Sequence, residues 1–258
     1  MWITRELTDK SEILAYLETD RPYAAYAIGD LETGLFEQCT WAGAEKDGRL
    51  QALALYFRGL RLPAFVLMGE PEGLQAIFRE LLYPQHAYLT CCAEHLAMLA
   101  RFYAWEERIP MWRMALAPPH FRPVKGTCVR LGPRHADQLT ALYAHGGGDA
   151  FMPSQLERGV FYGIFAEDKL VAAAGTHLVS PTYHVAAVGN VFTHPDYRGR
   201  GFGTVTTSAV VAELLQQDIA DIVLNVSQDN AAAIALYERL GFRRTCPFFE
   251  GPAHAIAQ

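Results

Sequence analysis

The sequence predicts an α/β fold: a mixed, largely antiparallel sheet flanked by helices, present in two tandem copies. Three observations lead to this fold class. Helix-like and strand-like periods of apolar residues alternate along the chain. Each half begins with segments typical of antiparallel hairpins and then changes to strand–helix–strand, which favours a mixed sheet. A run with three prolines, 117–123, separates the halves, so we expect domains at residues 1–118 and 124–258.

The second half is expected to follow the order helix, three strands, helix, strand, helix and strand. Apolar spacing places these elements at residues 133–143, 161–166, 170–179, 184–193, 203–217, 222–226 and 230–240, and near Phe248. The first half repeats much of this order. Its elements are expected at residues 13–17, 41–44, 50–57, 64–68, 74–82, 87–91, 94–103 and 111–116. The repetition indicates a duplicated α/β unit.

Composition and charge exclude several classes of protein. The chain has 22 Lys and Arg against 28 Asp and Glu, a net charge of -6, and supplies no basic face for nucleic acid. No apolar stretch approaches the roughly 18 residues of a membrane helix, and the first residues resemble neither a signal peptide nor an anchor. We therefore expect a cytoplasmic protein with no membrane partner.

The cysteines are irregularly spaced and form no C-x-x-C or Cys/His ligand pattern. They are Cys39, Cys91, Cys92, Cys128 and Cys246. We expect reduced, partly buried thiols and no bound metal. No heptad repeat or long apolar edge indicates an oligomer.

One turn, between an expected strand and helix, is rich in glycine and arginine. Its glycines stand at alternate positions and are Gly199, Gly201 and Gly203. They let the backbone turn sharply, while Arg198 and Arg200 add charge beside the unpaired amides of a helix N-terminus. The turn predicts a site for an anionic group such as a pyrophosphate. The alternative is a tight turn with solvated arginines, since the G-x-G-x-G spacing matches neither common nucleotide loop.

A second segment, 224–242, predicts a helix with a defined start and end. Asn230 is a good N-cap and Gly241 a good stop. Asn230 and Tyr237 lie near one face of this helix. Capping alone would explain Asn230, and a core position with a surface hydroxyl would explain Tyr237.

The two segments together resemble the GNAT-type N-acetyltransferases. Arg198 to Gly203 is similar to the Q/R-x-x-G-x-G/A acyl-CoA signature, and residues 225–242 carry the D-N-x-x-A-x-x-x-Y-x-x-x-G-F pattern of a second motif. The resemblance covers roughly residues 125–250 and implies a GNAT-like fold with acetyl-CoA as cosubstrate. It assigns the cofactor to Val191, Phe192, Thr193, Arg198, Gly199, Arg200, Gly201, Phe202, Gly203, Thr204 and Asn230.

The first half has the same expected order of elements as the second half, but its corresponding turn lacks the positive charges. Residues 69–73 place Glu70 and Glu72 where the second half has arginines, and these carboxylates would repel a pyrophosphate. We therefore expect a degenerate GNAT-like copy that packs against the second half and shapes the acceptor site. Arg58 and Arg61 could serve an acidic acceptor or be solvated.

The resemblance implies direct attack of an amine, from a small molecule or a protein, on the acyl-CoA thioester. A backbone N–H at Val191 or Phe192 is the candidate donor to the carbonyl oxygen. Tyr237 stands at the family-like position for protonating the thiolate that leaves.

The base that takes the amine proton is left open. Many members of the family place a glutamate in the strand before the loop, whereas residues 186–190 hold no carboxylate. The remaining candidates are His177, His184, Asp149 and an ordered water molecule.

Two alternatives to the acyltransferase are considered. In the first, the acyl-CoA site survives without turnover, as a sensing or regulatory module. In the second, the protein binds nucleotides of another class, which the spacing of the loop disfavours.

Overall fold

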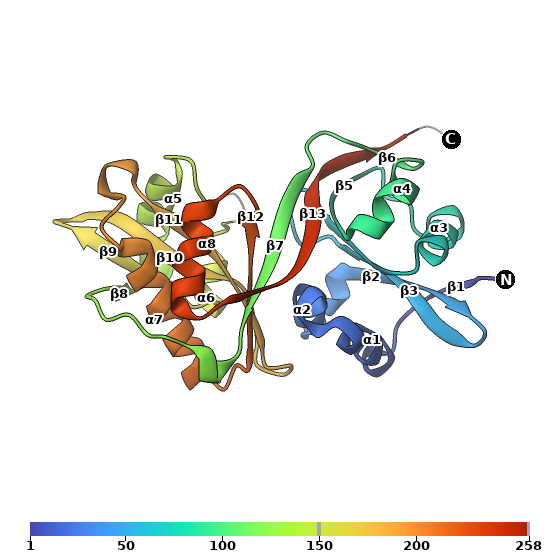
Figure 1. Cartoon of the computed structure of the whole chain (residues 1–258), viewed down its shortest axis with the longest axis horizontal. Helices are drawn as coiled ribbons and strands as arrows, with labels where there is room; N and C mark the ends of the chain where they lie inside the picture. The colour runs from blue at the N-terminus through green and yellow to red at the C-terminus, as the bar shows by residue number, and fades with distance from the viewer. Residues whose placement is uncertain (149–150, 257–258) are drawn as a thin grey trace. The chain divides into compact units, whose positions relative to one another are not determined.

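The computed structural model describes residues 1–148 and 151–256 (Figure 1). The chain divides into two compact units. Unit 1 comprises Met1–Trp112 and Cys246–Gln258, and unit 2 comprises Arg113–Thr245. The predicted boundaries at 118 and 124 differ from this division because they assign the last residues to the second domain. Strand β13 (Arg243–Ala255) instead pairs with a strand of unit 1.

Unit 2 is built on a mixed sheet in which most neighbouring strands are antiparallel and one pair is parallel. Its strands are β8 (Val129–Arg130), β9 (Tyr162–Ala166), β10 (Lys169–Ser180), β11 (Val185–Thr193) and β12 (Asp221–Ser227). The neighbours from β8 to β11 are antiparallel, and β11 with β12 is parallel. Residues 113–116 of β7 (Ile109–Leu116) continue the order beyond β12.

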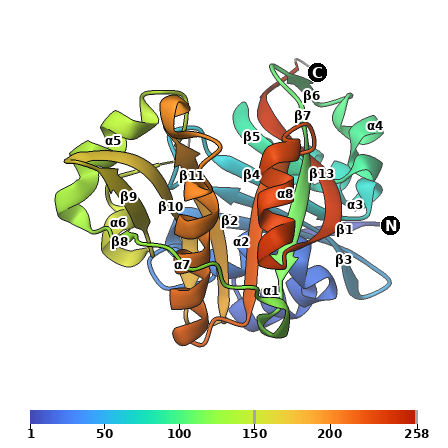
Figure 2. The same ribbon diagram turned by 60° about the vertical axis from the view of Figure 1, so that its left-hand side comes forward.

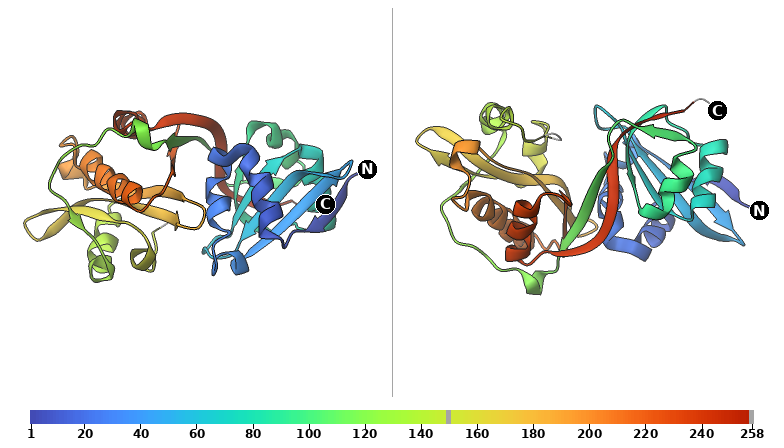
Figure 3. Two further views of the ribbon diagram at one scale, coloured as in Figure 1. Left: turned by 90° about the horizontal axis from the view of Figure 1, so that it is seen from below. Right: turned by 45° about the horizontal axis from the view of Figure 1, so that its top comes forward.

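Helices cover both faces of this sheet. The helices of unit 2 are α5 (Ala136–Tyr143), α6 (Gln155–Arg158), α7 (Phe202–Gln216) and α8 (Ala231–Leu240). Helix α7 lies on one face, with α8 beside it, and α5 and α6 lie on the other (Figures 2 and 3). Under α5 and α6, Leu139, Leu142 and Leu156 pack on Phe161, Leu170 and Phe192 in a buried core. This core fixes the path of β11, the strand that precedes the glycine-rich turn.

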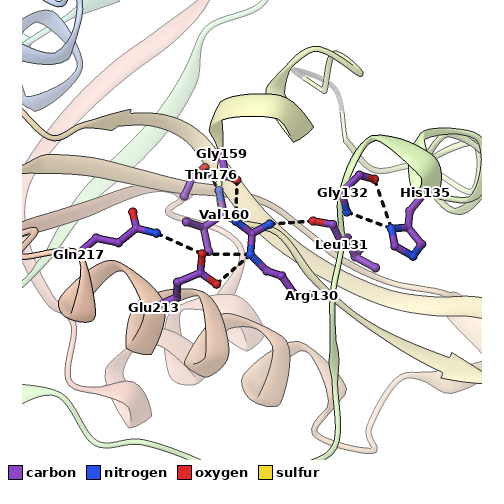
Figure 4. Close-up of polar contacts among 9 residues, drawn as sticks. All are labelled: Arg130, Leu131, Gly132, His135, Gly159, Val160, Thr176, Glu213 and Gln217. Atoms are coloured by element: carbon purple, nitrogen blue, oxygen red, sulfur yellow. Dashed lines mark hydrogen bonds and ion pairs between the residues drawn. The ribbon is translucent and has the colours of Figure 1, made fainter.

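The short edge strand β8 is held by side-chain contacts (Figure 4). Nε of Arg130 donates to both carboxylate oxygens of Glu213 on α7, at 2.8 and 3.0 Å. The guanidinium also donates to the carbonyls of Leu131, at 2.7 Å, and Gly159, at 3.1 Å. A strand of two residues has few backbone pairs, so this bifurcated contact and the two bonds to carbonyls add to its attachment.

Unit 1 repeats the same order of elements. Its strands are β1 (Ile3–Glu6), β2 (Cys39–Lys46), β3 (Arg49–Phe57), β4 (Ala64–Gly69), β5 (His86–Cys91) and β6 (Tyr103–Trp105), and its helices are α1 (Lys10–Leu17), α2 (Arg21–Gly29), α3 (Pro71–Glu80) and α4 (Leu96–Leu99). The pairs β1–β2, β2–β3 and β3–β4 are antiparallel, and β4–β5 is parallel. Residues 249–254 of β13 then pair antiparallel with β5.

The pairing details of the two units correspond. The amide of Leu7 donates to the carbonyl of Trp41 at 2.8 Å, and the amide of Leu131 donates to the carbonyl of Phe161 at the same distance. Each hairpin that follows turns through a residue of positive φ, Asp47 in unit 1 and Glu167 in unit 2. The element order and the hydrogen bonding therefore repeat, although the side chains differ.

The structure confirms the predicted fold class and the predicted helices and strands of both halves, with shifts of a few residues at their ends. Residues 94–103 are the exception, because α4 ends at Leu99 and Tyr103 begins β6. The structure adds β1, β6, β8, α2 and α6, which were not predicted. All five cysteines are free thiols. None of the helices within residues 1–148 and 151–256 has the length and apolar character needed to cross a membrane.

Candidate active site

The parallel strands β11 and β12 separate part-way along their length. Residues Val185–Val188 pair with Asp221–Leu224, and the pairing ends there. β11 continues to Thr193 and β12 to Ser227. The edge of β11 over residues 189–193 is therefore left open toward β12, with backbone donors and acceptors available to an extended ligand.

A bulge in β11 fixes the direction of this open edge. Ala173 pairs with Phe192 and Gly175 with Gly189, so Ala174 of β10 stands opposite two residues of β11. One of the two is Asn190, which has a φ of 51°. Such an extra residue bends its strand and redirects the side chains around it.

Two side chains hold Asn190 in this conformation. The hydroxyl of Tyr143 on α5 donates to its backbone carbonyl at 2.7 Å. Its side-chain Nδ2 donates to Oε1 of Gln155 on α6 at 3.3 Å. Neither Tyr143 nor Gln155 was singled out from the sequence, because nothing in their spacing indicates which backbone group they reach.

The glycine-rich turn leads from the open edge into the N-terminus of α7. Gly199 and Gly201 have φ values of 75° and 77°, and no atom lies within 4 Å of a side-chain carbon added at either position. The first helical hydrogen bond runs from the amide of Val205 to the carbonyl of Gly201, at 3.1 Å. The amides of residues 202–204 consequently have no acceptor within the helix and carry the partial positive charge of its N-terminus.

Both predicted arginines are held against the turn. Nε of Arg198 donates to the carbonyl of Thr193 at 3.3 Å, and its guanidinium lies 5.7 Å from the centre of the Phe192 ring. The guanidinium of Arg200 donates to the carbonyl of Asp196 at 3.4 Å and lies 4.9 Å from the centre of the Tyr197 ring. Neither forms an ion pair with any carboxylate that the structure describes, so their charge is available to an anion.

His194, at the start of the turn, forms a basic cluster with Lys169 and His145, which also line a hollow of about 460 Å³ together with Glu167 and Asp168. Nζ of Lys169 stands 3.3 Å from Nε2 of His194, and the His145 ring is 4.3 Å from the His194 ring, centre to centre. Burial has the largest effect and lowers the pKa of His194. The nearby Lys169 and His145 lower this pKa further, while the carboxylate of Asp196 raises it. His194 is thus neutral at neutral pH, and its Nδ1 accepts the amide of Asp196 at 3.3 Å.

Helix α8 lies beside the first turn of α7. A side-chain carbon added at Gly203 would come within 3.2 Å of Leu236 of α8, so glycine permits this close approach. Asn230 caps α8 by accepting the amide of Ala233 at 3.1 Å. This capping role is confirmed.

Tyr237 of α8 is buried, with 7% of its surface exposed. Its ring packs edge-on against Phe242, with 6.0 Å between ring centres. Burial raises the pKa of its hydroxyl to about 12. Because its pKa is raised, this hydroxyl keeps its proton at neutral pH. Among residues 1–148 and 151–256 it has no hydrogen-bond partner, so it is available as a donor.

The candidate bases lie in different places. His184 precedes β11 at the end far from the turn, where its Nδ1 stands 2.8 Å from the carbonyl of Asp218. His177 lies on β10 against Gly189, the first residue of the open edge. Asp149 lies outside the described residues. The described residues contain no group of three or more His, Cys, Asp or Glu suited to a metal ion.

The corresponding turn in unit 1 has the opposite charge. β4 pairs with β5 over residues 64–66 and then runs on to Gly69. Glu70 precedes α3 as its N-cap, Pro71 has no amide hydrogen, and Glu72 stands in the first turn. His95 makes a 2.9 Å hydrogen bond to the carbonyl of Gly69. The open strand end of unit 1 is thus partly occupied by the protein itself.

Comparison with known proteins agrees with this geometry. Residues 133–242 match the model of the acetyltransferase (GNAT) family. Residues 133–242 therefore form a GNAT domain, which lies within unit 2. The match contains the open edge of β11, the glycine-rich turn and Tyr237.

Among curated proteins, the chain is 36% identical over 92 residues to the ribosomal protein bS18-alanine N-acetyltransferase of Salmonella typhimurium. The matched stretch is 36% of the chain and spans 60% of the length of that relative. The chain is also 41% identical over 61 residues to the mycothiol acetyltransferase of Kocuria rhizophila, and this match covers 22% of the chain and 20% of that protein.

Solved GNAT structures share the fold. A putative GNAT acetyltransferase from Novosphingobium aromaticivorans has a TM-score of 0.60 at 23% identity, covering 79% of this chain and 89% of its own. A tandem GNAT protein from the clavulanic acid biosynthesis pathway has a TM-score of 0.58 at 13% identity and covers 100% of this chain and 99% of its own. The second likeness extends over both units.

Proposed function

We propose that this protein transfers an acetyl group from acetyl-CoA to an amine of a small molecule or a protein by direct attack. The observation that carries the proposal is the open edge of β11, which leads straight into the exposed amides of the α7 N-terminus. An extended ligand with an anionic end fits this combination of strand edge and helix terminus.

The residues of the turn fit the pyrophosphate of coenzyme A. Space is open at Gly199 and Gly201, and the amides of residues 202–204 lack acceptors in the helix. Arg198 and Arg200 add two charges at the same place. The backbone of Val191, Phe192 and Thr193 would hold the pantetheine arm, and Asn230 lies at the start of the neighbouring helix α8.

Acetyl-CoA supplies the acetyl group as an activated thioester. A backbone amide at Val191 or Phe192 would donate to its carbonyl oxygen. Tyr237, whose hydroxyl is protonated at neutral pH, would give a proton to the departing sulfur. These roles are proposals that rest on the family and on the placement of the residues.

We further propose that unit 1 is a degenerate GNAT copy that holds no acyl-CoA at the turn after β4. Glu70 and Glu72 place negative charge at the N-terminus of α3, where a phosphate would need positive charge. The repeated element order supports duplication, and the likeness to a tandem GNAT structure agrees with it.

A thermal-shift titration with acetyl-CoA tests the binding step. At a free concentration of about 100 times its Kd, a ligand stabilises the folded protein by roughly 2.7 kcal/mol. Gly201→Asp should abolish the shift by placing a carboxylate in the turn. Gly34→Asp is the matched control, because Gly34 also has a positive φ and open space but lies in unit 1. Absence of a shift in the wild type would refute the proposal.

Release of the thiol of coenzyme A tests turnover. The panel of acceptors should include a peptide that begins with alanine and small primary amines, in view of the named relatives. Release that depends on an amine supports the enzyme. Binding without release across the panel would instead indicate a catalytically silent acyl-CoA module.

A further inference from the structure

A second bulge, this one in β10, sets His177 apart from the regular strand. Thr176 pairs with Val188 and Leu178 with Ala187, so His177 is the extra residue of a one-residue shift in the register with β11. Bulges redirect a side chain where a regular strand would point it elsewhere. Here the redirected side chain is an imidazole within the central part of the sheet, beside the buried Thr176 and Asn190.

The imidazole of His177 occupies the space of a missing side chain. A carbon added at Gly189 would collide with Nε2, Cε1 and Cδ2 of the ring. Gly189 directly follows Val188, the last residue of β11 that pairs with β12. The ring therefore stands at the point where the two strands separate, in the place where a side chain of β11 would project.

Polar contacts hold this ring through Asn190. The side chain of Asn190 lies close enough to His177 to raise the pKa of the imidazole, and its Nδ2 donates to Oε1 of Gln155 at 3.3 Å. The backbone of Asn190 is fixed by the hydroxyl of Tyr143 at 2.7 Å. A ring held in this way has a defined orientation, which proton transfer requires. His177 as a whole residue is partly exposed to solvent.

The position of the His177 ring along β11 matches the place expected for the reacting end of the ligand. Five residues, 189–193, separate the end of the strand pairing from the turn. At about 3.3 Å per residue they span roughly 16 Å. An extended arm that starts with its phosphates at the turn and follows this edge has its sulfur end directed toward Gly189 and the His177 ring.

The reaction needs a proton acceptor at that end. An amine nitrogen that bonds to a carbonyl carbon becomes far more acidic than the free amine and must lose a proton. Burial lowers the pKa of His177 to about 4, although the hydrogen bond to Asn190 raises it. The imidazole is therefore neutral at neutral pH and has a lone pair to offer. A weak base suffices for so acidic a proton.

We infer that His177 accepts the proton that the acceptor amine loses during acetyl transfer. The carbon–nitrogen bond forms, the carbon–sulfur bond breaks, the amine proton passes to His177, and the sulfur receives a proton from Tyr237. Exchange with solvent then returns both residues to their starting states. The inference rests on the proposed function and chooses His177 over His184, which lies at the other end of β11.

Two substitutions test the inference by turnover of the best amine of the panel. His177→Gln should lower kcat by about 100-fold or more, while the thermal shift produced by acetyl-CoA is unchanged. Gly189→Ala should also lower kcat, because the added methyl displaces the ring while leaving it in the protein. His184→Gln is the control and should keep the wild-type rate. Added imidazole should restore part of the rate of His177→Ala, which a purely structural role would not allow.

An NMR measurement tests the placement without any acceptor. In histidine-labelled protein, addition of acetyl-CoA should move the imidazole signals of His177 and leave those of His184 in place. A kcat of His177→Gln within threefold of the wild type, or a His177 signal that ignores bound acetyl-CoA, would overturn the inference and leave the proposed function standing. Failure of acetyl-CoA to bind at all would overturn both.

Discussion

The hydroxyl of Tyr143 donates a 2.7 Å hydrogen bond to the carbonyl of Asn190, two residues beyond the last parallel pair of β11. Unit 1 contains the same relationship, because the hydroxyl of Tyr23 donates to the carbonyl of Leu67 at 2.9 Å, one residue beyond the last pair of β4. In each unit a tyrosine from a preceding helix thus holds a strand where it leaves its neighbour. These two hydrogen bonds therefore help to fix each strand where it separates from its neighbour.

Tyr143→Phe should weaken both unit 2 and its ligand site. Loss of one buried hydrogen bond costs about 1 kcal/mol of the free energy of unfolding. The freed carbonyl of Asn190 should also let the open edge move, so the Kd for acetyl-CoA should rise. Tyr23→Phe is the matched control, since it removes the corresponding bond from unit 1. Denaturant unfolding and calorimetric titration would measure the two effects, and an equal rise of Kd in both variants would contradict the assignment of the site.

Replacing Arg198 and Arg200 by glutamine should weaken acetyl-CoA binding through charge alone. Both side chains are exposed, so each loss is expected to cost about 1 kcal/mol, or roughly fivefold in Kd. The double variant should also show a smaller dependence of Kd on salt. Titration at low and high ionic strength measures this. A Kd that does not change in the double variant would show that the arginines are merely solvated.

Tyr237→Phe should lower kcat and leave binding unchanged. The hydroxyl has a pKa of about 12, so it is protonated at all physiological pH values and can donate to the leaving sulfur. We expect kcat to fall by about 10- to 100-fold. Steady-state thiol release across neutral and mildly alkaline pH should show the same ratio of variant to wild type throughout. A ratio that changes within this range would indicate that a different group titrates.

The stability of the protein should fall as the pH drops from about 6.5 to about 4, in part because of His177. Its pKa is lowered in the folded state, so in this window the unfolded chain binds a proton that the folded chain does not, and stability rises with pH. His177→Gln should flatten this part of the curve. His184→Gln serves as the control. Thermal midpoints measured against pH would reveal the difference, and parallel curves for wild type and His177→Gln would contradict it.

Arg130→Ala should destabilise unit 2 by about 1 to 2 kcal/mol. The substitution removes an ion pair with Glu213, in which Nε is shared by both carboxylate oxygens, and two hydrogen bonds to backbone carbonyls. Arg21→Ala is the comparison, because the ion pair of Arg21 with Glu18 joins side chains three residues apart at 3.3 Å and should contribute little. Denaturant midpoints of the two variants would rank them. Equal midpoints would show that β8 does not depend on its side-chain contacts.

Much of the fold could be predicted because the strands and helices of both units have clear periods. Helix α2 could not, since Tyr23, Ala24, Ala25, Ala27 and Ile28 are all buried and leave no polar face to mark a helical stripe. Strands β1 and β8 have only four and two residues, too few to show alternation. The pairing of β13 with β5 joins residues more than 150 positions apart and leaves no local signal.

The candidate site, like the fold, could be predicted only in part. The glycine-rich turn could be predicted because its glycines and arginines are neighbours in the chain, and the structure brings them together at the N-terminus of α7. The placement of His177 could not, because it depends on a one-residue bulge and on the missing side chain of Gly189 in the next strand. Sequence analysis left His177 and His184 as equal candidates, and only the register of β10 with β11 separates them.

The course of β13 has a consequence for how the protein is made. The ribosome completes residues 1–112 first, yet the sheet of unit 1 needs residues 249–254 as the partner of β5. Unit 2 is one continuous stretch, so all of its residues emerge before that last strand does. Domains that emerge first ordinarily fold first. The sheet of unit 1 can therefore be completed only after all of unit 2 has been synthesised, because β5 lacks its partner strand until residues 249–254 are available.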